Sequence, residues 1–184
     1  MPRIPTPPTI EDAPETARPL LQAVKRQLGV APNLMRLISN SPETLAGYLG
    51  LNQALAGGKL SAQTRERIAL TIANINGCTY CNSAHTYLGK NAKLDDAEIA
   101  AARDGRSADP KAHAALHFAR AVAVKRGAVS DAEFNAVRAA GYADAEILEI
   151  VGAVALNTLT NYVNDVFKTD VDFPVFEAKR LANV

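Results

Sequence analysis

Several helix-length segments of the chain begin at a capping residue and end at a glycine. Ser61 precedes a segment that closes at Gly77. Serine and aspartate favour helix N-caps because their side-chain oxygens accept from the exposed amides of the first turn, and glycine favours the position just past a helix. The same pattern recurs in segments that open at Ser41, Asp109 and Ser130 and close at Gly57, Gly127 and Gly141. This pattern predicts an all-α fold.

The spacing of apolar residues supports the same assignment. The expected helices span residues 20–28, 33–38, 42–56, 61–76, 78–91, 95–103, 110–126 and 131–140, and a last long helix is capped by Asp144. Ile68, Ile72 and Ile75 recur at helical spacing and face the core. The last helix is apolar on nearly every side over residues 147–159, which predicts burial between other helices or between subunits.

The 184 residues are enough for one domain with a sizeable core. Residues 1–19 hold six of the ten prolines and are expected to be either a frayed tail or an arm laid across a neighbouring subunit. Residues 20–184 are expected to form a single helical domain. The tail from Asp172 is expected to begin as a loop and to end in a short helix.

Charge and cysteine content exclude several classes of protein. Lysine and arginine number 20 against 19 acidic residues, with no basic run, so nothing favours nucleic acid or a membrane surface as a partner. The N-terminus lacks the apolar core of a signal peptide. Both cysteines lie in one motif, which argues against a secreted disulfide scaffold. We therefore expect a cytoplasmic protein.

Cys78, Cys81 and His85 share one face of the predicted helix over residues 78–91, within roughly a sixth of its circumference. The α-carbons of the two cysteines would lie about 5 Å apart, inside the range that a disulfide accepts. His85, one turn beyond Cys81, can exchange a proton with it directly or through one water. Glu66 points the same way if its helix folds against this one. These four residues indicate a redox dithiol with a proton acceptor.

Three other interpretations compete with the redox dithiol. A structural disulfide would close a four-residue loop and contribute only about 2 kcal/mol. A zinc site made of the same four residues has suitable ligands, but Cys78 and His85 would lie about 10 Å apart along the helix axis. The third interpretation is a pair of buried, inert thiols. The residues alone also leave the nucleophile open, because the helix N-terminus favours Cys78 whereas His85 favours Cys81.

The motif resembles that of the AhpD-like alkylhydroperoxidases, within the carboxymuconolactone decarboxylase superfamily. Eleven residues separate Glu66 from Cys78-x-x-Cys81, and three more separate Cys81 from His85. The resemblance extends from about Gly29 to Pro174, and it includes Gly29-Val-Ala-Pro-Asn33 and Val171-Asp-Phe-Pro174.

The resemblance implies an AhpD-like helical bundle that acts as an oligomeric peroxidase, a trimer or a hexamer, with no bound cofactor or metal. It implies that Cys81 attacks the hydroperoxide O–O bond, that Cys78 resolves the sulfenic acid as a disulfide, and that Glu66 and His85 relay protons. An external dithiol, lipoyl-type or thioredoxin-like, then reduces the bridge. The best-known members carry a histidine immediately before the second cysteine. Here that residue is Tyr80, as in the peroxidase-related branches.

Two functions of other classes stay open. One is a lyase like the decarboxylases of the same superfamily, which lack the CxxC. The other is a non-catalytic redox sensor or interaction protein that forms the disulfide slowly and passes it to a partner.

The sequence shows a weak internal similarity when it is aligned with itself at a shift of 83 residues. The shift aligns Ser61 with Asp144, Glu66 with Glu149, Asn74 with Asn157, Cys78 with Asn161 and Cys81 with Asn164. This similarity predicts two related helical halves, of which only the first carries thiols.

Two further sets of residues stand at helical spacing. Asn157, Asn161 and Asn164 form a polar strip on the last helix, and buried amide bonding between helices is slightly favoured over lining of the thiol pocket. His113 and His117 lie four residues apart on one face, and without a third ligand they are expected to be a packed or solvated pair rather than a metal site.

Overall fold

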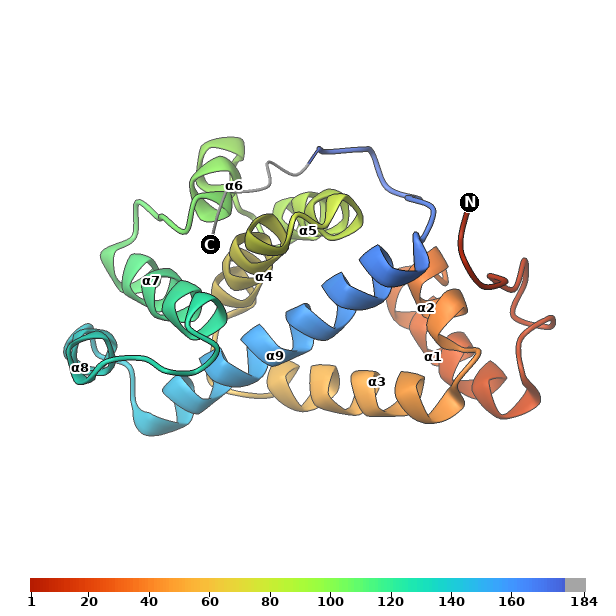
Figure 1. Ribbon diagram of the computed structural model, residues 1–184, viewed down its shortest axis with the longest axis horizontal. Coiled ribbons are helices and arrows are strands. Elements are labelled where there is room, and N and C mark those ends of the chain that lie inside the picture. Colours follow the sequence, from red (N-terminus) through yellow and green to blue (C-terminus); the bar gives the residue numbers. More distant parts are fainter. Residues whose placement is uncertain (178–184) are drawn as a thin grey trace.

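The computed structural model describes residues 1–177, and that part of the chain contains nine α-helices, one short 3₁₀ helix and no strand (Figure 1). The elements are η1 (Glu15–Ala17), α1 (Arg18–Leu28), α2 (Asn33–Ile38), α3 (Pro42–Ala56), α4 (Ala62–Asn76), α5 (Thr79–Asn91), α6 (Asp96–Arg103), α7 (Pro110–Val124), α8 (Asp131–Ala139) and α9 (Asp144–Phe167). The predicted all-α class is confirmed.

The capping residues place most helix ends where the sequence predicts them. Ser61 accepts from the Thr64 amide and opens α4, and Gly77 closes α4 with a left-handed φ of 69°. Ser130 and Glu133 form a reciprocal capping box at the start of α8. These helix ends are therefore set by side-chain and backbone interactions within a few residues, without tertiary contacts.

Two boundaries differ from the prediction. The α7 helix ends two residues early, because Arg126 adopts a left-handed φ of 52° ahead of Gly127 at 87°. The N-cap of α9 is Ala143 rather than Asp144, and the Ala143 amide donates to the Glu146 carboxylate at 2.8 Å. Arg126 therefore helps to end α7 ahead of Gly127, and Ala143 acts as the N-cap of α9 in place of Asp144.

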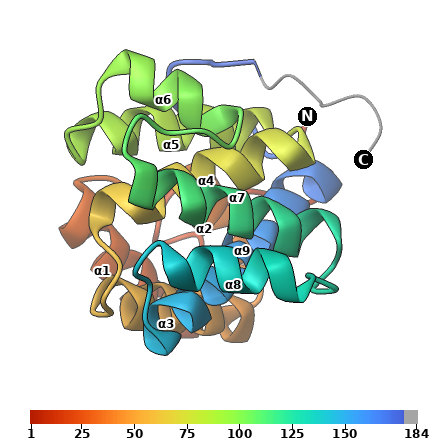
Figure 2. The same cartoon turned by 90° about the vertical axis from the view of Figure 1, so that its left-hand side faces the viewer.

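The α4 helix lies at the centre of the molecule and packs against α5, α6, α7 and α9. Ile68, Leu70 and Ile72 of α4 are fully buried. Figure 1 shows α9 crossing the molecule between α3 and the α4–α5 pair, and Figure 2 shows α7 between α4 and α8. Because α4 contacts helices on several sides, the side chains it carries are held in fixed positions.

Buried apolar residues form two clusters. The first lies between α4, α6, α7 and α9 and includes Ile72, Leu116 and Ile150. The second joins the N-terminal residues and α1–α3 to the start of α5, and it contains both Cys78 and Cys81. The two thiols are therefore part of a packed interior rather than of a surface loop.

The N-terminal arm packs on its own chain, so the expectation of a frayed tail for residues 1–19 is wrong, and the arm across a neighbouring subunit stays a prediction. Ile10 and Ala13 are buried in the second cluster. The Arg3 amide donates to the Phe167 carbonyl at the end of α9, and the Arg36 guanidinium donates to the Pro7 carbonyl, both at 2.8 Å. Prolines leave carbonyl groups free of local partners, and side chains of the helical body donate to them.

After α9 the chain turns back across the outer face of α5, and residues 168–177 are called the C-terminal strap here (Figure 1). The strap begins at Lys168, which has a left-handed φ of 55°. Asp172 accepts from the Asn33 amide at 2.7 Å, and the Phe176 amide donates to the Ser83 hydroxyl at 2.8 Å. The strap is a loop, as expected for its start, and the short helix predicted beyond it falls outside the described residues.

The two segments related by the 83-residue shift pack against each other but differ in shape. The α4–α5 segment breaks at Gly77, whereas α9 continues unbroken through the corresponding position, Thr160. Glu149 on α9 accepts from the amides of Lys59 and Leu60 at 2.8–2.9 Å, and a side chain at Gly58 would collide with its carboxylate. The prediction of two related halves stays a prediction.

The outer face of α9 carries a row of exposed apolar side chains. The row comprises Leu148, Val151, Leu159, Tyr162 and Val166. The inner face is buried, as predicted, through residues such as Ile147 and Ile150. Within residues 1–177, no helix is both long enough and apolar enough to cross a membrane.

Candidate active site

Cys78 is the N-cap of α5. The chain leaves α4 through the left-handed Gly77 and reaches Cys78 in an extended conformation, with φ −81° and ψ 101°. The Cys78 sulfur accepts from the Cys81 amide at 3.1 Å, in the position that a serine oxygen occupies at other helix starts. The thiol therefore lies at the positive end of a 13-residue helix, where a negative charge is stabilised.

Cys81 lies one turn into α5 and is 2% exposed. The Asn164 side-chain amide donates to its sulfur at 3.3 Å. Burial, together with the hydrogen bond to Cys78, raises the pKa of the Cys81 thiol well above its ordinary value. The hydrogen bond from the Cys81 side chain lowers the pKa of Cys78, against the opposing effects of burial and of the Asp165 charge. The two sulfurs thus form an unequal pair, in which the Cys78 thiol gives up its proton more readily than the Cys81 thiol.

Glu66 and His85 are brought together by the packing of α4 on α5. The Glu66 Oε2 atom lies 2.8 Å from His85 Nδ1, and the two side chains are about one-fifth exposed, at 21% and 20%. Both line a small cavity of about 60 Å³ between α3, α4 and α9, together with Tyr48. Burial, followed by the charges of Cys81 and Glu66, raises the pKa of Tyr48 to about 12. Tyr48 therefore keeps its proton and presents a neutral hydroxyl beside this pair.

A larger cavity lies beside Cys78, and we call it the Cys78 cavity. Its volume is about 440 Å³, and its lining includes Cys78, Thr79, Asn164, Lys168, Thr169 and Val171. Two buried polar atoms of this lining, Asn164 Oδ1 and Thr169 Oγ1, have no hydrogen-bond partner among the described residues. Asn164 and Thr169 are 5% and 8% exposed.

Comparison with known proteins agrees with this geometry. Residues 42–125, which run from α3 to the end of α7 and contain all four predicted site residues, match the model of the carboxymuconolactone decarboxylase family. The fold matches that of a peroxidase-related protein from Ralstonia eutropha JMP134, described as an alkylhydroperoxidase AhpD core, with a TM-score of 0.83. Residues 42–125 thus match the carboxymuconolactone decarboxylase family, and the described chain has an AhpD-like fold. The predicted resemblance is thereby confirmed.

The structural matches extend over nearly the whole chain. The Ralstonia protein is 23% identical, and the match covers 93% of this chain and 92% of that one. A peroxidase-related protein from Silicibacter sp. TM1040 matches with a TM-score of 0.77, 21% identity and coverage of 92% and 93%. A variant of the debrominase Bmp8, in complex with 2,3,4-tribromopyrrole, matches with a TM-score of 0.78, 20% identity and 94% of each chain. At these identities the matches establish the AhpD-like fold. Comparison with curated proteins finds none that matches this chain.

Tyr80, which stands where the best-known AhpD-like members have a histidine, is a structural residue in this structure. Its hydroxyl donates to Asp172 Oδ1 at 2.8 Å and accepts from the Leu34 amide at 3.2 Å. Its ring packs edge-on against Phe173, with centroids 5.7 Å apart. Burial raises the pKa of Tyr80 far above its usual range. The phenol therefore stays protonated and ties α2 and the C-terminal strap to α5.

The asparagine strip on α9 reaches the thiols, which corrects the slight preference for purely structural amides. Asn161 accepts from Asn76 of α4 at 2.9 Å, as predicted for buried amides that bond between helices, whereas Asn157 bonds within its own helix, to the Ala153 carbonyl. Asn164 instead contacts Cys81. The 83-residue shift aligns Asn164 with Cys81, and this was the one sequence signal that linked the two positions.

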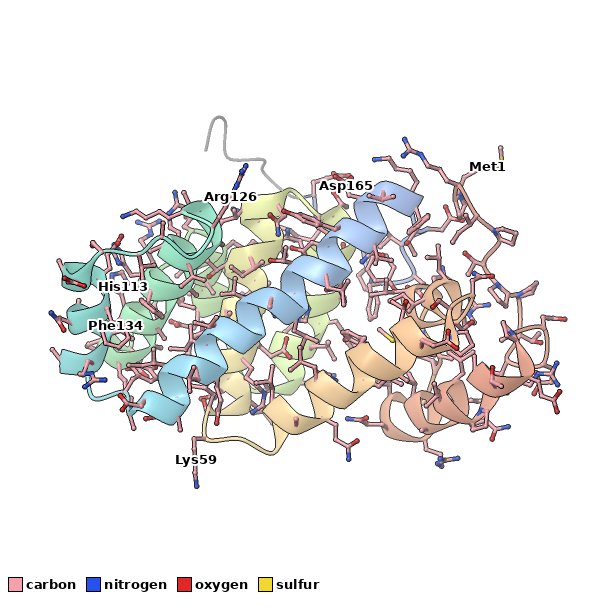
Figure 3. All side chains as sticks on the ribbon, turned by 60° about the horizontal axis from the view of Figure 1, so that its bottom comes forward. Met1, Lys59, His113, Arg126, Phe134 and Asp165 are labelled. Carbon is pink, nitrogen blue, oxygen red and sulfur yellow. The ribbon has the colours of Figure 1, made fainter. Side chains whose placement is uncertain are left out.

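His113 and His117 lie on the exposed side of α7 and take no part in this site. Figure 3 shows His113 well away from Asp165, which lies near the C-terminal end of α9. Residues 1–177 contain no group of three or more side chains of metal-binding type arranged to hold an ion.

Proposed function

We propose that this AhpD-like protein is a thiol-dependent peroxidase that reduces hydroperoxides through a Cys78–Cys81 dithiol/disulfide cycle. The observation that carries the proposal is the unequal thiol pair, in which Cys78 caps α5 and Cys81 lies one turn further on. The helix N-terminus favours the thiolate form of Cys78, and Cys81 is close enough to resolve an oxidised Cys78. The Glu66–His85 pair provides the proton acceptor and donor that such a cycle requires.

The cycle has two protein steps and one external step. A thiolate attacks the O–O bond and becomes a sulfenic acid, and the other oxygen leaves as an alkoxide that takes up a proton. The second sulfur attacks the sulfenic sulfur, releases water and forms the disulfide. An external dithiol, lipoyl-type or thioredoxin-like, then reduces the disulfide by exchange. The cycle needs no bound cofactor or metal. In a cytoplasmic location, the reducing environment would help to return Cys78 and Cys81 to the dithiol form.

A structural role for the thiols accounts poorly for their surroundings. A bridge between Cys78 and Cys81 would close only a four-residue loop and would stabilise the fold by about 2 kcal/mol. The α4–α5 junction is already fixed by the Gly77 turn and by a backbone hydrogen bond of 2.9 Å from Cys78 to Ala73. The hydrogen bond from Asn164 to Cys81 adds nothing to such a brace, whereas a polar contact on the sulfur suits thiol chemistry.

Reductive dehalogenation is the second candidate. The fold likeness to a debrominase extends over 94% of both chains, and a cavity of about 440 Å³ beside Cys78 is within the size range of small-molecule sites. A dithiol can deliver two electrons to a carbon–bromine bond, in which case carbon takes a proton, bromide leaves and the disulfide forms. With 2,3,4-tribromopyrrole as probe, bromide release coupled to thiol loss would favour this function.

We also propose that the protein is a homo-oligomer, a trimer or a hexamer. The apolar row on α9 supports this proposal, since Leu148 is 72% exposed and Tyr162 is 59% exposed. Contiguous apolar surface on a soluble protein usually marks an interface. Light scattering of the purified protein gives the mass directly.

The deciding experiment is hydroperoxide consumption with a dithiol donor for wild type, Cys78→Ser, Cys81→Ser and the double variant. The peroxidase loses both thiols rapidly when peroxide is added and turns over only when both sulfurs are present. A redox sensor would form the disulfide slowly, without sustained turnover. A lyase of the decarboxylase type would consume no hydroperoxide, with or without the two sulfurs.

A further inference from the structure

We propose that Tyr48 relays a proton between the Cys81 thiol and the Glu66–His85 pair through the small cavity of about 60 Å³ that it lines with that pair. This role rests on the proposed dithiol cycle, in which Cys81 must lose its proton whichever of the two sulfurs is oxidised first. Tyr48 is then a positioning residue, which serves the cycle by moving a proton and makes no bond to the hydroperoxide.

Tyr48 lies on the inner face of α3. Leu45, three residues earlier, is fully buried, and Asn52 and Leu55 follow Tyr48 at helical spacing and line the same small cavity. Residues at this spacing share one face of a helix. The Tyr48 side chain is therefore directed into the molecule rather than toward solvent.

The small cavity connects Tyr48 to the Glu66–His85 pair. The Glu66 carboxylate and the His85 ring lie 2.8 Å apart, and both line the cavity together with Tyr48. A water molecule needs about 10–15 Å³ and two to four polar partners, and this cavity exceeds that volume and offers that many partners. One water can therefore join the Tyr48 hydroxyl to the pair.

Tyr48 also lies beside the thiols. Its side chain packs against the second buried cluster, which contains Cys81. Burial raises the pKa of Tyr48 to about 12, and the charges of Cys81 and then of Glu66 add to this effect. The hydroxyl thus stays protonated at neutral pH and lies within electrostatic reach of both groups that exchange the proton.

Tyr80, which precedes Cys81 in the chain, is not available for this role. Its hydroxyl donates to Asp172 and accepts from the Leu34 amide, so it is already engaged in both directions. The side chain of Tyr48, in contrast, borders a cavity that holds the proton acceptor.

The relay leaves Tyr48 neutral. A hydroxyl both donates and accepts, so Tyr48 can take the proton of the Cys81 thiol while its own proton passes to the Glu66–His85 pair. Cys81 becomes a thiolate, the pair gains one proton, and no electron moves in this step. The pair then gives the proton to the alkoxide or hydroxide that the cycle releases, which leaves as an alcohol or as water.

The test is the rate of disulfide formation in wild type, Tyr48→Phe and Tyr48→His, with hydrogen peroxide and, in parallel, with diamide, which oxidises dithiols without peroxide. Phenylalanine keeps the ring and removes the hydroxyl, whereas histidine changes the shape but still donates and accepts protons. Tyr48→Phe should slow disulfide formation at least about tenfold with either oxidant, and Tyr48→His should be faster than Tyr48→Phe. A purely structural role for Tyr48 predicts the reverse order of the two variants.

Tyr142→Phe is the matched control. Tyr142 is 4% exposed and belongs to the first buried cluster, away from both cysteines, and burial likewise raises its pKa to about 12. Its replacement should leave the rate of disulfide formation unchanged.

The outcomes separate the relay from the peroxidase function. Wild-type rates in Tyr48→Phe with both oxidants, or a Tyr48→His variant slower than Tyr48→Phe, would overturn the relay. If peroxide leaves the wild-type thiols reduced but diamide oxidises them in the predicted order of variants, the peroxidase function is wrong and the relay stands. Wild-type thiols that resist diamide as well would overturn both.

Discussion

Replacing Tyr80 with phenylalanine isolates the hydroxyl that joins three parts of the fold. The substitution keeps the ring and its edge-on contact with Phe173 at 5.7 Å, but it removes the bonds to Asp172 and to the Leu34 amide. If Tyr80 is structural, Tyr80→Phe should cost stability and leave the thiol chemistry intact. A proton-relay role would predict the opposite pattern.

The magnitude follows from the two hydrogen bonds. The Leu34 amide is buried and would lose its only described side-chain acceptor, which costs about 1 kcal/mol. The bond to Asp172 is charge-assisted, but Asp172 is partly exposed and water can replace the phenol, so we assign it about 1 kcal/mol as well. The total of about 2 kcal/mol corresponds to a fall in Tm of about 4–8 °C for a chain of this length.

Thermal unfolding followed by circular dichroism measures the change in Tm, and single-turnover thiol loss measures the chemistry. Tyr87→Phe is the control, since Tyr87 is 51% exposed and contacts the same Phe173 ring at 6.1 Å. Its Tm should change by less than about 2 °C. An unchanged Tm in Tyr80→Phe, or a loss of thiol oxidation without a loss of stability, would refute the structural role of Tyr80.

Three further predictions follow from the site. Glu66→Gln should slow peroxide reduction by about a hundredfold, because it removes the carboxylate that pairs with His85. Glu149→Gln changes the corresponding carboxylate on α9, which accepts from two backbone amides far from the sulfurs. This control variant should lower Tm and leave the rate of peroxide reduction unchanged. Because the pKa of Cys78 is lowered and that of Cys81 is raised, iodoacetamide at pH 7 should label Cys78 first. The labelling should slow as the pH falls through the Cys78 pKa, since the thiolate is then protonated. Peptide mapping that finds Cys81 labelled first would contradict this order. Tyr162→Glu should weaken self-association at least about tenfold by light scattering, with unchanged helicity, since like charges would meet across an apolar contact.

The sequence predicted best what local chemistry controls. Ser61 and Gly77 set the ends of α4 through a capping bond and a left-handed turn, and both effects act within a few residues. The spacing of Cys78, Cys81 and His85 is likewise a property of one helix. The contact of His85 with Glu66 needed only that consecutive helices pack against each other.

The remaining features depend on contacts between distant segments. Asn164 meets Cys81 because α9 lies across the start of α5, and its rotation about its own axis is set by packing over its whole length. The arm at residues 1–19 packs on the helical body because the Arg36 guanidinium donates hydrogen bonds to proline carbonyls of the arm. The proline content of the arm does not predict these hydrogen bonds. The C-terminal strap is fixed in a similar way by Tyr80, whose place in the motif gave no sign of a structural partner.

The central claim is that Cys78 and Cys81 are one redox couple, and a single-turnover titration tests it most directly. Reduced protein is mixed with one equivalent of hydroperoxide, and free thiols and peptide masses are measured over time. The account predicts rapid loss of both thiols and a Cys78–Cys81 disulfide that a dithiol reverses. Thiols that persist while peroxide disappears, or peroxide consumption by the variant without either sulfur, would contradict it.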